Sequence, residues 1–153
     1  NHSVGFKGWK LLIISIYPRG KDWLFMQEEL REKEPTILFT HRLIYASPLA
    51  KGIAMVFCKT NLLSPQWRNL AYRIRSNPQI KMVVSGHSHS NFLWKKDGVY
   101  YISTSSLTEV PHQFRVIEVY PDTIETYLYT SRNFQEVKKG KWIMGKRKIL
   151  PLR

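Results

Sequence analysis

Short apolar segments alternate with segments of helical periodicity in the front half of the chain. Residues 10–17, 36–40 and 81–85 are apolar runs of strand length, which indicates three buried strands. Residues 21–33 and 64–77 repeat apolar side chains at helical spacing, which predicts two amphipathic helices between those strands. The order strand, helix, strand, helix, strand is typical of a sheet with parallel strands.

The periodicity changes in the back half, where two pairs of short strand-like segments are each interrupted by a turn signal. Asp97-Gly98 interrupts the first pair and Pro121-Asp122 interrupts the second. The paired segments are residues 91–95 with 99–103, and residues 115–120 with 123–129. We therefore predict an α/β fold with a mixed sheet, two helices on one face and a C-terminal β meander. Such a sheet needs cover on its other face as well.

The composition is that of one globular domain, because 43% of the 153 residues are hydrophobic and 23% are charged. The single cysteine, Cys58, excludes an internal disulfide framework and a cysteine-based zinc site. It favours a reducing compartment, and we expect the protein to be cytoplasmic. The longest apolar run, residues 11–16, is far shorter than the roughly 20 residues needed to span a bilayer. We therefore expect no transmembrane segment.

Positive charge is concentrated at the C-terminal end of the chain. The net charge is +13, and the residues after Glu136 carry seven cations and no acid, which leaves 13 − 7 = +6 on the preceding part. We predict a globular unit at residues 1–130 and a basic extension at residues 131–153. The extension is either a solvated tail or a patch for nucleic acid, an anionic membrane surface or an acidic protein.

Three histidines follow directly after predicted buried strands. His41 follows residues 36–40, while His87 and His89 follow residues 81–85, where Gly86 is expected to free the backbone. Side chains at the carboxyl ends of neighbouring parallel strands meet at one edge of the sheet. Imidazoles placed in this way can bind one metal ion or two adjacent ions. The alternative is that they are loop histidines hydrogen-bonded to the backbone.

These segments, in this order, resemble the C-terminal half of the calcineurin-like metallophosphoesterases. The resemblance runs from about Gly8 to Leu128 and is carried by the strand before His41, by Gly-His-x-His at residues 86–89 and by the closing strands. The segment that begins at His41 is also similar to purple acid phosphatases. The resemblance implies half of a four-layer α/β/β/α sandwich. It also implies hydrolysis of a phosphate mono- or diester with two divalent metal ions, which could be Mn, Fe, Zn, Co or Ni.

The resemblance also implies roles for individual residues. His41 and His87 would ligate the second metal ion, and His89 the first. If Asn1-His2 is the end of a Gly-Asn-His motif, Asn1 is a further ligand of the second metal ion and His2 protects or protonates the leaving oxygen. These assignments make His41, His87, His89 and Asn1 candidate metal ligands and His2 a candidate catalytic residue.

Two further residues are predicted to bind substrate from their position alone. Arg42 and Tyr45 follow closely after His41, near the edge of the sheet where the metal ions would lie. Either side chain could contact the phosphate of the substrate. The alternative for Tyr45 is a packing role in the core.

The sequence departs from the family in lacking its Asp-x-His and bridging-aspartate motifs. The three aspartates, Asp22, Asp97 and Asp122, are predicted helix-cap and turn residues. The chain alone would therefore hold at most one partial metal site, and we expect a fragment or subunit completed by an N-terminal half or a second chain. Two alternatives are a noncatalytic binding or scaffolding subunit and a nucleic-acid-directed phosphodiesterase that uses the positive charge.

Overall fold

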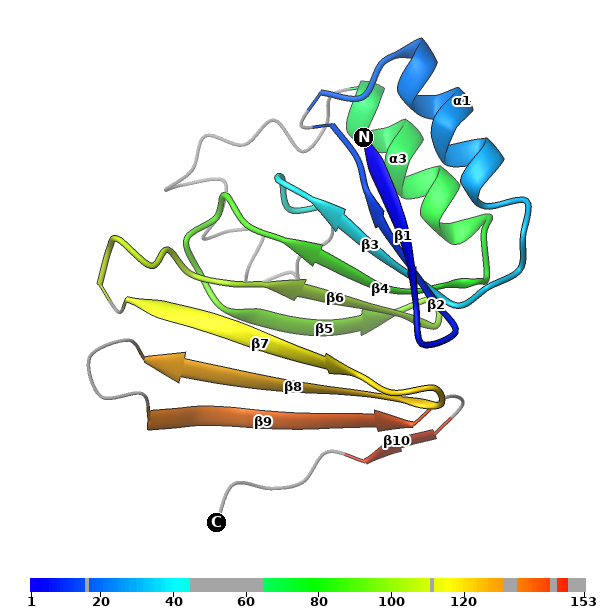
Figure 1. Cartoon of the computed structure of the whole chain (residues 1–153). Helices are drawn as coiled ribbons and strands as arrows, with labels where there is room; N and C mark the ends of the chain where they lie inside the picture. Colours follow the sequence, from blue (N-terminus) through cyan, green and yellow to red (C-terminus); the bar gives the residue numbers. More distant parts are fainter. Residues whose placement is uncertain (16, 45–64, 111, 131–134, 144–145, 149–153) are drawn as a thin grey trace.

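The computed structural model describes most of the chain. The described residues are 1–15, 17–44, 65–110, 112–130, 135–143 and 146–148, with only the backbone for the last two ranges. A six-stranded sheet has the order β1-β2-β3-β4-β6-β5, and a four-stranded sheet has the order β10-β9-β8-β7 (Figure 1). The strands of the first sheet are β1 (His2–Phe6), β2 (Trp9–Ile13), β3 (Thr36–Thr40), β4 (Ile80–Ser85), β5 (Phe92–Lys96) and β6 (Val99–Ser103).

The centre of the six-stranded sheet is parallel and its edges are antiparallel. Strands β2, β3, β4 and β6 pair in parallel, while β1 and β5 each join an edge as one arm of a hairpin. The crossovers β2 to β3 and β3 to β4 contain the helices α1 (Gly20–Glu29) and α3 (Pro65–Arg75). The predicted α/β fold with a mixed sheet and two helices is confirmed.

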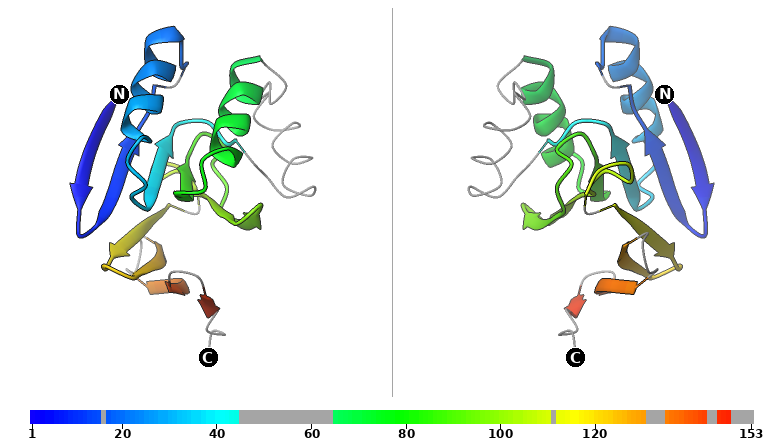
Figure 2. Two further views of the ribbon diagram at one scale, coloured as in Figure 1. Left: turned by 90° about the vertical axis from the view of Figure 1, so that its right-hand side faces the viewer. Right: turned by 90° about the vertical axis from the view of Figure 1, so that its left-hand side faces the viewer.

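Both helices pack on the same face of the six-stranded sheet (Figure 2). Alternate residues of the central strands, such as Leu12, Leu38 and Val83, point toward α1 and α3. The helices contribute Met26, Leu30, Trp67, Leu70 and Ile74 to this core. Burial of these apolar side chains fixes the strands against the helices and so fixes where each strand ends.

The second sheet covers the other face. It consists of β7 (Gln113–Val119), β8 (Thr123–Thr130), β9 (Gln135–Ile143) and β10 (Lys146–Lys148), all antiparallel. Val119 and Ile124 of this sheet pack with Trp9, Ile37 and Met82 of the first sheet in a second core. The predicted C-terminal meander is confirmed. It continues into residues 131–153, which were expected to be a basic extension, because β9 and β10 are strands. The boundary at residue 130 stays a prediction.

The cover on this second face is partial. Val4, Phe6 and Ile13 lie on the same face of the sheet as Trp9, because β1 and β2 pair Phe6 with Trp9, Val4 with Leu11 and His2 with Ile13. They are nevertheless 45%, 45% and 47% exposed. An apolar strip at the β1–β2 edge is therefore left uncovered by the described residues.

No described helix combines the length and the hydrophobicity needed to cross a membrane.

The β1–β2 hairpin was not predicted from the sequence. Its turn, Lys7-Gly8, has φ of 51° and 76°, and so both central residues adopt the left-handed backbone of a type I′ turn. Lysine is not typical of that position, which is why the turn signal is weak. The predicted turn at Asp97-Gly98 has the same conformation, with φ of 50° and 79°, and is confirmed.

Candidate functional site

His41 and His87 follow the carboxyl ends of two adjacent parallel strands, β3 and β4. In the β3–β4 pairing, Thr40 lies opposite Ser85, and so His41 and Gly86 leave the sheet side by side. The N–H of Gly86 donates a hydrogen bond of 3.1 Å to the carbonyl oxygen of His41. This bond continues the ladder of the sheet one step beyond the strands and holds the two chain segments together.

The imidazoles of His41 and His87 are in direct contact. Nε2 of His41 lies 3.0 Å from Nδ1 of His87, and the ring centroids are 4.9 Å apart at an angle of 64°. Two nitrogen ligands of one ion, each at about 2.1 Å, stand about 3.0–3.4 Å apart for cis or tetrahedral geometry. The observed separation therefore suits two ligands of a single metal ion as well as an imidazole–imidazole hydrogen bond.

The backbone of the Gly-His-Ser-His segment is left-handed at both histidines, with φ of 62° at His87 and 49° at His89. Gly86, which was expected to supply the backbone freedom, is not in that conformation, and a Cβ on it would meet only the carbonyl oxygen of His41 at 3.8 Å. The segment is anchored instead by Ser88, whose buried hydroxyl lies 2.8 Å from the hydroxyl of Ser103 in β6. Backbone strain is thus localised at the histidines themselves.

His89 is oriented by a carboxylate, that of Glu109, which was not predicted from the sequence. Its Nδ1 lies 2.7 Å from Oε2 of Glu109, and the two side chains are 51% and 59% exposed. Glu109 belongs to the loop between β6 and β7 and has no motif around it. A carboxylate on Nδ1 keeps the proton there and leaves the Nε2 lone pair available to a ligand.

Arg42 is held beside the histidine pair by two aromatic rings. Its Nη2 donates a hydrogen bond of 2.8 Å to the hydroxyl of Tyr17, and its guanidinium carbon lies 5.0 Å from the centroid of that ring. The ring of Trp67, which is buried in α3, lies 6.0 Å away. These contacts orient a permanent positive charge. The other predicted substrate-binding residue, Tyr45, lies outside the described residues.

The electrostatic surroundings favour a neutral imidazole at His87. Burial lowers the pKa of His87 from its usual 6.5, and electrostatic interactions with His41, Arg42 and His89 lower this pKa further. A neutral imidazole is the form that binds metal ions.

Because the pKa of His87 is lowered in the folded state, protonation of this side chain destabilises the folded state relative to the unfolded state. Between the lowered value and 6.5, this side chain is neutral in the folded state and protonated in the unfolded state, so stability falls as the pH falls through that range. We therefore expect the stability difference between wild type and His87→Asn to decrease from about pH 8 to about pH 5.5. Urea unfolding at both pH values checks this. An equal difference at both would contradict it.

Asn1 and His2 lie at the start of the chain, where Asn1 contacts α1 and His2 is the first residue of β1. Nδ2 of Asn1 donates a hydrogen bond of 2.6 Å to Asp22, and Oδ1 of Asn1 accepts a hydrogen bond of 2.7 Å from the N–H of Ser15. Asn1 thus joins the end of β2 to the first turn of α1, where Asp22 is the third helical residue and accepts a hydrogen bond from the N–H of the N-cap residue Arg19. His2 is an exposed residue of β1, opposite Ile13. The metal and catalytic roles of Asn1 and His2 stay predictions.

The histidine, cysteine and carboxylate side chains of the described residues form no cluster of three that could hold a metal ion. The donor set at this edge is therefore the His41–His87 pair, with His89 engaged by Glu109. These imidazoles fit part of a coordination sphere for a divalent ion. Oxygen ligands that would neutralise a second ion are not among the described side chains around the pair.

No family model and no curated protein matches the sequence, but solved structures match the fold. GAP50, the anchor in the inner membrane complex of Plasmodium, matches with a TM-score of 0.63 and 15% identity over 92% of this chain and 50% of GAP50. A purple acid phosphatase from yellow lupin seeds matches with a TM-score of 0.61 and 11% identity over 94% of this chain and 32% of its own. A dimetal phosphatase from Danio rerio matches with a TM-score of 0.55 and 16% identity over 80% of this chain and 37% of its own.

At these identities the likeness concerns the fold, and the chain spans half or less of the length of each of these proteins. The mixed sheet of this chain, with its two helices and C-terminal antiparallel strands, matches half of a metallophosphoesterase sandwich. The chain therefore has the calcineurin-like metallophosphoesterase fold, in the form of a half-sandwich.

Proposed function

We propose that this chain supplies the C-terminal half of a metal-dependent site that hydrolyses a phosphate mono- or diester. The observation that carries the proposal is the His41–His87 pair, whose nitrogens lie 3.0 Å apart at the carboxyl ends of two adjacent parallel strands. A hydrogen bond between two solvated loop histidines would not need this placement. One protein with the same fold is described as a dimetal phosphatase, which supports divalent metal use.

Each residue at this edge of the sheet has a distinct part in the proposed site. His41 and His87 hold one ion through Nε2 and Nδ1, and His89, oriented by Glu109, offers Nε2 to the other. Arg42, fixed between Tyr17 and Trp67, binds a phosphate oxygen. The metal ions would supply Lewis-acid charge to the phosphoryl group.

The bridging carboxylates of such a site are proposed to come from a further segment, because Glu109, the carboxylate in contact with these histidines, is already engaged by His89. All three aspartates lie in cap or turn positions, and Asp22 is engaged by Asn1 and by the N–H of Arg19. The exposed strip of Val4, Phe6 and Ile13 beside the second sheet supports a further segment or subunit packed on this face. We propose that this segment carries the missing carboxylates.

Titration with Co²⁺ tests the histidine pair directly, because coordinated Co²⁺ absorbs visible light in a ligand-dependent way. We expect His87→Asn to weaken Co²⁺ binding at about pH 7.5 by about 10–100-fold or more, since the loss of residues that merely support a ligand already costs that much. Asparagine is chosen because it tolerates the left-handed backbone of His87.

His112→Asn provides the matched control. His112 is also left-handed, with φ of 53°, and its Nδ1 lies 3.1 Å from the carbonyl oxygen of Leu107 in a loop. This substitution should leave Co²⁺ affinity unchanged. If the two variants bound Co²⁺ equally well, the histidine pair would not be a metal site.

The second candidate function is a noncatalytic binding or scaffolding subunit. It is favoured by the likeness to GAP50, which is described as an anchor. In that case, His87→Ala and His89→Ala would leave partner binding intact. The basic residues 131–153 would then provide a surface for an acidic protein or for nucleic acid, and a nucleic-acid-directed phosphodiesterase could use the same charge.

A further inference from the structure

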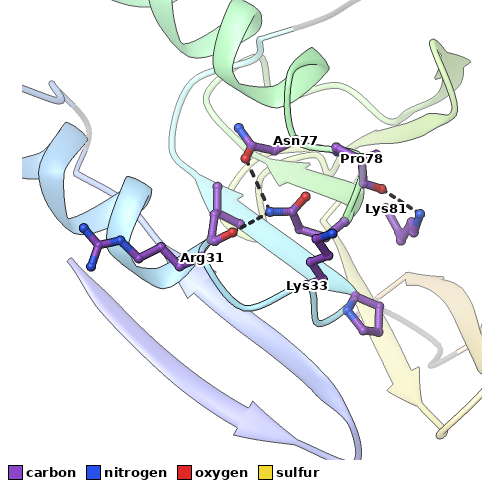
Figure 3. Close-up of a pocket in the computed structure, with 8 residues that line it drawn as sticks. Arg31, Lys33, Asn77, Pro78 and Lys81 are labelled. Atoms are coloured by element: carbon purple, nitrogen blue, oxygen red, sulfur yellow. Dashed lines mark hydrogen bonds between the residues drawn. The ribbon is translucent and has the colours of Figure 1, made fainter.

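A cavity of about 660 Å³ opens at the edge of the six-stranded sheet opposite the histidines (Figure 3). Its walls are formed by two segments, one before β3 and one at the start of β4: Leu30, Arg31, Lys33 and Pro35, and Asn77, Pro78, Gln79 and Lys81. His41 and His87 follow the other ends of the same two strands. At about 3.3 Å per residue, the six residues of β4 separate the cavity from the histidines by about 20 Å.

The two walls are joined by hydrogen bonds. Nε2 of Gln79 donates to the carbonyl oxygen of Leu30 at 2.7 Å and lies 3.3 Å from Oδ1 of Asn77. The amide of Asn77 in turn donates to the carbonyl oxygen of Arg73 at 2.6 Å. The N–H of Thr36 donates to the carbonyl oxygen of Gln79 at 2.8 Å. The cavity is therefore preorganised, and a ligand would not have to order its walls.

Positive charge in the cavity is not balanced by lining carboxylates. Lys33 and Lys81 line it, and in the described part of the chain neither forms an ion pair. The ammonium of Lys81 donates to the carbonyl oxygen of Pro78 at 2.6 Å. Arg31 also lines the cavity, but it lies 3.3 Å from Glu28, and its side chain extends away from the other labelled residues (Figure 3).

The remaining lining is largely apolar. Pro35, Pro78 and Leu30 line the cavity together with the two lysines. The volume is in the range of small-molecule sites, so a bare inorganic anion would leave most of it unfilled. An anion attached to a flat apolar body would use both the lysines and the prolines.

We propose that this cavity binds a nucleoside monophosphate. The phosphate lies between Lys33 and Lys81, and the base packs against Pro35 and Pro78. Because the cavity is at the opposite edge of the sheet, this site is independent of the proposed metal site.

Calorimetric titration of the full chain with AMP in the presence of EDTA tests the proposal. We expect AMP to bind at least about tenfold more tightly than adenosine or inorganic phosphate, because only AMP uses both parts of the cavity. Lys33→Gln and Lys81→Gln should each weaken AMP binding by about 5-fold, and added salt should weaken it as well. His87→Asn should leave AMP affinity unchanged.

A variant with Lys21→Gln and Arg68→Gln is the matched control. It removes two exposed cations from the first turns of α1 and α3, outside the cavity lining, and AMP binding should survive. The proposal is overturned if AMP does not bind, if phosphate binds as tightly as AMP, or if the Lys33→Gln, Lys81→Gln double variant binds AMP like wild type. Loss of AMP binding in His87→Asn would place the nucleotide at the histidines instead.

Discussion

His87→Asn is expected to lower metal-dependent hydrolysis of an aryl phosphodiester by on the order of 1,000-fold. The substitution removes one of two imidazoles 3.0 Å apart, and a metal ion that is no longer held there withdraws several kcal/mol of transition-state stabilisation. The assay uses the protein isolated, with the chains that accompany it, from the cells that make it, in added Mn²⁺. This source is needed because the missing carboxylates are proposed to lie outside the sequence.

The control for this assay is again His112→Asn, which removes an imidazole from a left-handed position in a loop. It should retain full activity. Hydrolysis that is unchanged in His87→Asn would come from another enzyme and would contradict the proposed function. A wild-type preparation without Mn²⁺-dependent hydrolysis would favour the noncatalytic subunit.

The parallel strands and the two helices could be predicted because short, local segments of the sequence indicate each of them. Thr36–Thr40 is an apolar run, and the structure forms a strand over that range. The helices begin and end within a few residues of their predicted limits, since Pro35 and Pro78 lie beyond their ends and Pro65 lies at the start of α3. The first strand was predicted to extend to residue 17, but β2 ends at Ile13.

What could not be predicted depends on contacts between distant segments. Glu109 reaches His89 across 20 residues from a loop without a motif, and Tyr17 reaches Arg42 across 25 residues. The strand β1 has only weak alternation, with Gly5 next to its last residue, and it forms because it pairs with β2. The histidines could be found because they directly follow strands, whereas the residues that orient them carry no such signal.

Leu70→Ala is expected to reduce the free energy of unfolding by about 2–5 kcal/mol. Leu70 lies in the middle of α3, is 0% exposed and belongs to the same core cluster as Leu38, which lies three residues before His41. The substitution leaves a cavity between α3 and the strands that present the histidine pair. Urea unfolding measures the loss, and in a domain of this size the Tm should fall by about 3 °C for each kcal/mol.

Leu24→Ala is a matched control for this prediction, because it makes the same chemical change within the other helix. Leu24 is 68% exposed in α1, so its truncation removes little buried surface and should change stability by no more than about 0.5 kcal/mol. Equal losses in the two variants would mean that α3 does not pack on the sheet as described. Contacts other than those of α3 would then have to hold β3 and β4 in place and so set the separation of His41 and His87. A large loss for Leu70→Ala alone would show that α3 packs through Leu70 on the core that also contains Leu38.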